Sequence, residues 1–168
     1  SDLTTINAGT IAVTVNNALG TNGSGTTIGA SGTLDLQNVT YSTTEALTVN
    51  GGTIKTSTGT SSFAGTISLT ANSTVDVGGT QLTLSGIISS TSTYSLTKTS
   101  SGILILSGAN TYSGGTIIKN GTITAGSAAA NALGTGTITL GDSAGGSNNA
   151  SLLISITGLT YSNAIALA

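Results

Sequence analysis

The chain has 168 residues, a length that fits one domain, and only 5% of them are charged: three Lys, five acidic residues and no Arg. A net charge of −2 excludes nucleic-acid binding through a basic stripe and a polybasic membrane anchor. His, Cys, Met, Trp and Pro are absent, which excludes disulfides, thiolate nucleophiles and zinc sites and removes the commonest general base. The 25 Gly, with abundant Thr, Ser, Asn and aliphatic residues, are typical of a repetitive β protein.

Gly-Thr followed by an apolar residue opens a series of short segments in which apolar and polar residues alternate. In chain order the clearest are residues 11–15, 34–36, 67–69, 82–84 and 138–140. Such alternation between Gly, Asn and Ser clusters predicts short, half-buried strands. Two strands fall within each ~20–25 residues, the usual length of one rung of a β-solenoid. The sequence therefore predicts an all-β fold, a parallel solenoid of about seven or eight rungs.

Asn-Gly dipeptides at 22–23, 50–51 and 120–121 allow a second interpretation, because this dipeptide favours the tight turn of an antiparallel hairpin. A β-sandwich of hairpins would use it, and so would the left-handed corners of a solenoid. The absence of Pro, which sandwiches place at edges and turns, favours the solenoid.

Three blocks of sequence return later in the chain in the same order. The pairs are residues 6–11 and 118–123, 17–21 and 131–135, and 39–42 and 159–162, with offsets of 112, 114 and 120 positions. We therefore expect a long repeat of 112–120 residues. Residues 1–168 would form a single solenoid segment, an internal slice of a longer array. No apolar stretch approaches the ~18 residues of a membrane-spanning helix, and no leader-like segment opens the chain.

Residues 96–123 carry a more specific pattern: Leu96 and Lys98, then Ser-Gly-Ala-Asn-Thr-Tyr-Ser-Gly-Gly-Thr at 107–116, then Gly-Thr-Ile at 121–123. This segment resembles the passenger-associated transport repeat of Gram-negative autotransporters. It departs from the family pattern at Ser100, where Gly is usual, and at Ile123, where Leu is usual. The resemblance implies a right-handed parallel β-helix, exported through the outer membrane and displayed on the cell surface. A domain not present here would attach it to that membrane.

The acidic residues are isolated along the chain: Asp2, Asp35, Glu45, Asp76 and Asp142. Asp35 and Asp76 each lie between apolar residues, so the alternation directs them to solvent. On neighbouring rungs they could pair as glycosidase carboxylates do, but the chain lacks His, Arg and a Trp sugar platform. The calcium-binding pattern Gly-Gly-x-Gly-x-Asp never completes. We therefore predict no catalytic, cofactor-binding or metal-binding residue, no cofactor, and no enzyme activity.

The four Tyr, at 41, 94, 112 and 161, are expected to pack their rings at corners, with each hydroxyl bonded to a turn; a glycan-binding row is the alternative. Lys98 and Lys119 are expected to project from turns. Thr122, Thr124, Thr137 and Thr139 are expected to face outward, which β propensity explains and an ice-binding array would also require. On the strand at 103–106, Leu104 and Leu106 are expected to face inward, because Ile103 and Ile105 share the other parity.

We expect a structural stalk of a cell-surface autotransporter, an adhesin-like filament, whose stacking outside the cell also helps to pull the passenger through its pore. The alternatives are a binding module for glycan, protein or ice on an outward Thr, Asn and Tyr face, and a polysaccharide lyase on the same fold. The expected partners are neighbouring repeats, a second copy stacked end to end, and a host ligand bound through other domains. Neither nucleic acid nor the membrane is expected as a partner of this segment.

Overall fold

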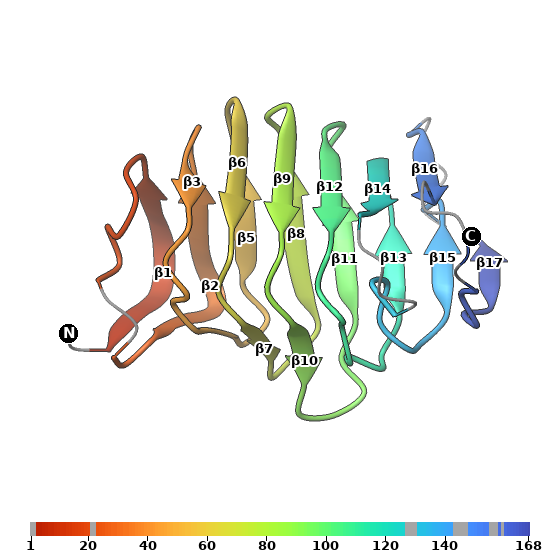
Figure 1. Ribbon diagram of the computed structural model, residues 1–168, viewed down its shortest axis with the longest axis horizontal. Coiled ribbons are helices and arrows are strands. Elements are labelled where there is room, and N and C mark those ends of the chain that lie inside the picture. Colours follow the sequence, from red (N-terminus) through yellow and green to blue (C-terminus); the bar gives the residue numbers. More distant parts are fainter. Residues whose placement is uncertain (1–2, 21–22, 127–130, 143–147, 155–157, 159) are drawn as a thin grey trace.

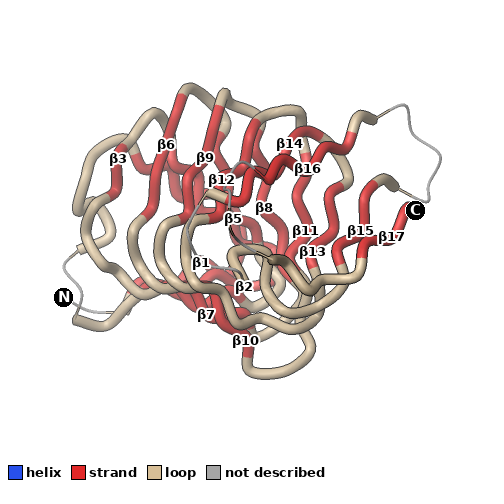
Figure 2. The backbone as a smooth tube through the Cα atoms, turned by 45° about the vertical axis from the view of Figure 1, so that its right-hand side comes forward, coloured by secondary structure: helices blue, strands red, loops and turns tan. Residues whose placement is uncertain are grey.

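The computed structural model describes residues 3–20, 23–126, 131–142, 148–154, 158 and 160–168. Asp2, Asn22 and Leu159 lie outside the described residues. The regular structure in the described part is entirely β-strand, and successive turns lie side by side along one axis (Figures 1 and 2). The strands are β1 (Thr4–Val13), β2 (Thr26–Leu36), β3 (Thr40–Tyr41), β4 (Leu47–Val49), β5 (Thr53–Thr56), β6 (Thr60–Phe63), β7 (Ile67–Leu69), β8 (Ser73–Val77), β9 (Gln81–Leu84), β10 (Ile88–Ser90), β11 (Leu96–Thr99), β12 (Ile103–Leu106), β13 (Thr116–Ile118), β14 (Gly121–Ala125), β15 (Ile138–Leu140), β16 (Ala150–Ile154) and β17 (Ile165–Leu167).

The strands form three faces around a shared core. The first face contains the start of β2 followed by β4, β7 and β10, and the second contains the end of β2 followed by β5, β8, β11, β13, β15 and β17. These two faces belong to one sheet because β1 and β2 bend across the corner between them. The third face is a separate six-stranded sheet of β3, β6, β9, β12, β14 and β16.

Every strand pair in the described part is parallel, with one turn of the chain between partners. The β-solenoid is confirmed, and the hairpin sandwich is wrong. Gly51 and Gly121, in two of the Asn-Gly dipeptides, have φ angles of 79° and 75° and form left-handed corners between faces.

The solenoid makes about six turns, fewer than the seven or eight predicted. Along one core column of the second face, successive partners are 20 to 23 residues apart from Leu34 to Leu140, but Leu140 pairs with Leu167, 27 residues on. From Ile11 to Leu167 the mean spacing of this column is still about 22 residues, so the assumed rung length was adequate. The prediction overcounted because it took as whole the incomplete turns before β3 and after β16, which have no strand on the third face.

Alternating residues of each strand enter the core and stack on the same position of the next turn. On the third face the column is Tyr41, Phe63, Leu84, Leu106 and Ala125, all without exposed surface. The rings of Tyr41 and Phe63 are stacked, with centroids 5.4 Å apart. Leu104 and Leu106 are fully buried whereas Ile103 is 37% exposed, so the predicted parity of this strand is confirmed.

Two blocks of the predicted long repeat form the same tight turn. Gly20 N donates to Asn17 O, and Gly134 N donates to Asn131 O, both over 2.9 Å. The length of the repeat and its place in a longer array stay predictions.

A column of glycines, Gly65, Gly86 and Gly108, lies on three successive turns at the corner that follows the third face. A Cβ on Gly86 would lie 1.9 Å from Gly65 O, and a Cβ on Gly108 would lie 2.3 Å from Gly86 O. The obstructing atoms are backbone, which cannot rotate away. Only glycine therefore allows these corners to stack at the spacing of the sheet.

We predict that Gly86→Ala lowers the free energy of unfolding by about 1–3 kcal/mol, because the added methyl overpacks the corner. Gly78→Ala is the matched control, since the nearest atom to its Cβ would be Thr56 O at 3.8 Å. Urea unfolding followed by far-UV circular dichroism measures both. Equal stability of the two variants would contradict the steric role of the glycine column.

Candidate functional site

The repeat motif places a lysine inside the core. Lys98 occupies the core column of the second face, with Val75 on the turn before and Ile118 on the turn after, and it has no exposed surface. The expectation that Lys98 projects from a turn is wrong: it shares the parity of Leu96, which faces inward. Lys119 follows β13 and is partly exposed, with its Nζ 3.7 Å from Asp142 Oδ1.

The Lys98 ammonium is satisfied by backbone carbonyls at a corner. Its Nζ donates to Thr99 O at 2.6 Å, Ser100 O at 2.7 Å and Asn120 O at 3.1 Å. The last of these links two turns of the solenoid. Burial lowers the pKa of Lys98 to about 8, and the Asp76 carboxylate partly opposes the shift.

Asn110 joins three turns with one side chain. Its Oδ1 accepts from Ile88 N at 2.7 Å, and its Nδ2 donates to Ala132 O at 2.5 Å. The side chain is fully buried. Asn110 follows β12 in the chain and lies one turn beyond β10, the last strand of the first face. Its amide bonds Ile88, the first residue of β10, where no further strand of the first face does so.

Tyr112 and Thr116 form a third buried hydrogen-bonded group of the repeat. We call Lys98, Asn110, Tyr112 and Thr116 together the motif junction. The Tyr112 hydroxyl lies 2.6 Å from Thr116 Oγ1, which donates to Leu133 O at 2.9 Å. Burial raises the pKa of Tyr112 well above its usual range. Every side chain of the junction points inward and binds a neighbouring segment, so none of them is presented to a ligand in solution.

The predicted burial of tyrosine rings is found for Tyr112 and Tyr41, but Tyr41 lies in β3 rather than at a corner, and the Tyr112 hydroxyl bonds the Thr116 side chain rather than a turn. Both are fully buried, and Leu19 N donates to the Tyr41 hydroxyl at 3.1 Å. Tyr94 and Tyr161 pack against the core and are partly exposed. The rings of Tyr41 and Tyr112 are therefore inaccessible to a glycan at the surface.

Asp35 and Asp76 lie two turns apart on the outer side of the second face, with Lys55 between them in register. The expectation that both point to solvent holds for Asp76, which is partly exposed, and is wrong for Asp35, which is 4% exposed. Burial raises the pKa of the Asp35 carboxyl, but hydrogen bonds from Gln37 and Ser57 and the charge of Lys55 outweigh it, so the pKa is lowered. Asp76 pairs with Lys55 at 3.5 Å and accepts from the Ser100 hydroxyl. The pair is thus neutralised by its neighbours rather than divided into an acid and a base.

Glu45 is buried and accepts from the Thr26 hydroxyl at 2.9 Å. Among the described residues, no three His, Cys, Asp or Glu side chains gather where a metal ion would need them. Within the same part of the chain, no helix has the length and apolar character required to cross a membrane.

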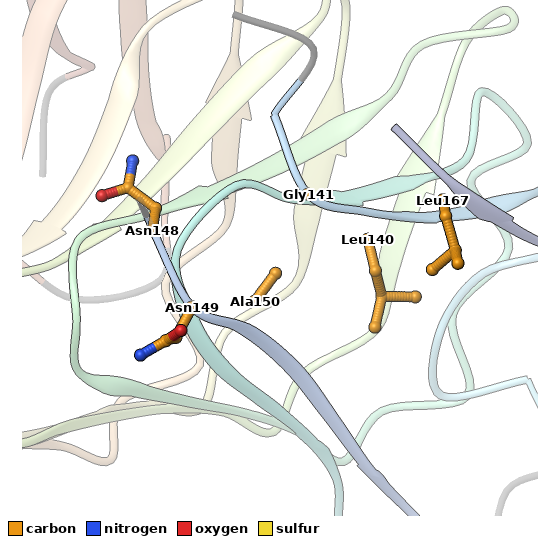
Figure 3. Close-up of a pocket in the computed structure, with 6 residues that line it drawn as sticks. All are labelled: Leu140, Gly141, Asn148, Asn149, Ala150 and Leu167. Atoms are coloured by element: carbon orange, nitrogen blue, oxygen red, sulfur yellow. The ribbon is translucent and has the colours of Figure 1, made fainter. Parts of the chain in front are cut away.

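A pocket lies at the last described turns, lined by Leu140, Gly141, Asn148, Asn149, Ala150 and Leu167 (Figure 3). Leu140 and Leu167 are register partners in the core column that also contains Lys98. The pocket therefore lies beside the core column at the last described turns, and its lining contains no titratable side chain.

Residues 96–125 match the family model described as passenger-associated-transport-repeat. The chain carries a passenger-associated transport repeat. The resemblance is confirmed, and the matched segment extends two residues beyond the predicted 96–123. No curated protein and no solved structure matches the chain.

The structure explains one departure of this repeat from the family pattern. Ser100, where Gly is usual, has a φ of 62°, in the left-handed region that glycine adopts without strain. Its hydroxyl donates to the Asp76 carboxylate on the preceding turn. At this position, serine adopts a backbone conformation that glycine adopts more easily, and its side chain forms a hydrogen bond to the preceding turn that glycine could not form.

Raising the pH from 7.5 to 9.5 should increase the free energy of unfolding. Unfolded Lys98 would keep a pKa near 10.5, whereas the folded value is about 8, so over this range the unfolded state binds more protons. The expected gain by pH 9.5 is about 2 kcal/mol. Measurements should stop below pH 10, where the raised pKa values of Tyr41 and Tyr112 reverse the trend.

Urea unfolding at each pH tests this prediction. Lys98→Met should remove most of the slope, and Lys119→Met, which changes a partly exposed lysine, should keep it. A flat or falling profile in the unsubstituted protein would contradict the burial of a titratable amine at this position.

Proposed function

We propose that this chain is a structural, non-catalytic segment of a bacterial cell-surface autotransporter passenger, a rod that holds an adhesive or effector region away from the outer membrane. One observation carries the proposal. The polar residues that mark the transport repeat face inward and bond adjacent turns to one another. The signature of the repeat therefore serves the stacking of the rod rather than the capture of a ligand.

The architecture also suits folding during export. Each turn pairs only with the turns before and after it, so a chain emerging from a pore can add one turn at a time to a folded end. Each added turn buries aliphatic surface and satisfies backbone groups that were exposed. Because each turn that folds outside the cell is stabilised in this way, folding would help to draw the rest of the chain through the pore.

The absence of enzyme activity belongs to the same proposal. The described carboxylates on the outer surface, Asp76 and Asp142, are each within ion-pair distance of a lysine. Neither environment separates the roles of a general acid and a general base.

An aligned row of hydroxyls favours a second candidate, a surface binding module. Thr10, Thr33, Thr53, Thr74 and Thr97 are register partners on five successive turns of the second face. Such a row repeats every ~4.8 Å and suits a ligand that is itself periodic, such as a glycan chain. The row ends at Ile117, the next partner in the column.

End-to-end stacking of copies extends the stalk proposal. The last strands leave apolar side chains uncovered: Leu167 is 84% exposed, Ile165 61% and Leu153 50%. A parallel turn of similar shape would cover them and pair the open strand edges. Such contacts do not close on themselves and produce filaments.

Surface display tests the stalk proposal. The full chain is placed between a signal peptide and an autotransporter barrel in a Gram-negative host, with an epitope at its outer end. Asn110→Ala removes two buried bonds between turns, and Thr111→Ala, at the exposed neighbour, is the matched control.

We expect the unsubstituted chain and Thr111→Ala to be displayed and to resist added protease, and Asn110→Ala to be displayed several-fold less. Equal display of both variants, or retention of the unsubstituted chain inside the cell, would contradict the proposal.

A further inference from the structure

Five of the seven charged side chains in the described part of the chain lie along one line on the outer side of the second face, and four of them are partly exposed while Asp35 is 4% exposed. Asp35, Lys55 and Asp76 are register partners on successive turns of the second face, and Thr99 follows on the next turn. Lys119 continues the line directly after β13. Asp142 lies two residues after the end of β15, one position beyond Gly141, and its Oδ1 is 3.7 Å from Lys119 Nζ. We call Asp35, Lys55, Asp76, Lys119 and Asp142 the charge stripe. The other described charged side chains, Glu45 and Lys98, lie outside the stripe and are buried.

The stripe has a definite order of signs along the rod. It reads negative, positive, negative, uncharged at Thr99, positive, negative. Asp76 and Lys119 lie one turn either side of Thr99, and Lys55 and Asp142 lie two turns either side. Opposite charges therefore lie the same number of turns from Thr99, with Asp142 one residue further along its turn than the column. Such a distribution of charge is what a surface needs to be complementary to itself after a two-fold rotation.

We propose that the second face is an interface between two antiparallel copies of this chain, with the two-fold axis at Thr99. Lys55 then meets Asp142 of the second copy, and Asp76 meets Lys119 of the second copy. The rotation produces each pair twice, so all four partly exposed charges of the stripe find an opposite charge. The same lysines and carboxylates remain paired within their own chains.

Other arrangements match fewer charges. A parallel pair of rods places each side chain of the stripe opposite its own copy, and like charges repel. Moving the antiparallel axis by one turn toward the N-terminus brings Asp76 against Asp76, and moving it one turn the other way brings Lys119 against Lys119. An axis between Lys55 and Asp76 avoids repulsion but leaves Lys119 and Asp142 unmatched.

The surface beside the stripe permits close approach. The adjacent outward column on the second face contains Thr53, Thr74, Thr97, Ile117 and Thr139, which are all β-branched and partly exposed. Two such faces can meet without large side chains between them. Because exposed ion pairs are weak and screened by salt, association should be weak for one segment and strongest at low ionic strength.

Cross-linking tests the axis directly, because the chain has no cysteine and each variant then carries a single thiol. In Thr99→Cys the two thiols meet across the axis, so a short thiol-specific cross-linker should give covalent dimers at low salt. In the matched control Thr53→Cys, on the same face, the two thiols would lie about 19 Å apart along the rods, and the yield should be several-fold lower.

Charge reversal tests the register. In the Thr99→Cys background, Lys55→Glu alone and Asp142→Lys alone should each lower the yield several-fold, and the two together should restore it. Thermal unfolding confirms that each variant is folded, and 0.5 M NaCl should lower the yield of the unreversed protein. Equal yields from Thr99→Cys and Thr53→Cys, or a double reversal no better than the single ones, would overturn the proposal. End-to-end stacking would not bring Thr99 near its copy.

Discussion

Parallel, in-register stacking of one turn on the next is the constraint on which the rest of this structure depends. Strands of a sheet lie about 4.8 Å apart, so each residue meets the residue about 20 to 23 positions before it and after it. The hydrogen-bond ladder of the backbone imposes that spacing on every side chain. The corners must stack at the same spacing, which leaves no room for a Cβ at Gly65, Gly86 and Gly108, and these glycines therefore lie on one line.

The same constraint explains how polar residues are held inside the core. An inward polar side chain has only its neighbouring turns and corners to bond with, and burial is costly unless it bonds there. Lys98 reaches the carbonyls of a corner, and Asn110 bonds Ile88 and Ala132 where the first face has lost its strands. Asn110 thus connects turns where the first face has no further strand, and Lys98 connects the corners of two turns of the second face.

The fold class followed from the sequence because period-2 alternation and Gly-rich corners are local signals. The parity of Leu104 and Leu106 was predictable for the same reason. The inward position of Lys98 could have been predicted, because Lys98 lies two residues after Leu96 and so faces the same side of the strand. We predicted a surface position instead because the side chain is charged. Corner geometry was harder to predict. The equivalent blocks around Gly9 and Gly121 form different corners, one within β1 and the other between β13 and β14. The charge stripe was not predictable, since residues more than 100 positions apart join it only once the length of each turn is known.

Distances between spin labels on one outward column test the stacking most directly. Thr10 and Thr97 are four turns apart in this register, and Thr10 and Thr139 are six turns apart. Double electron–electron resonance on the two doubly labelled cysteine variants should give distances near 19 Å and 29 Å, a difference of about 10 Å. Equal distances, or a shorter one for the pair with Thr139, would contradict the parallel stacking of turns.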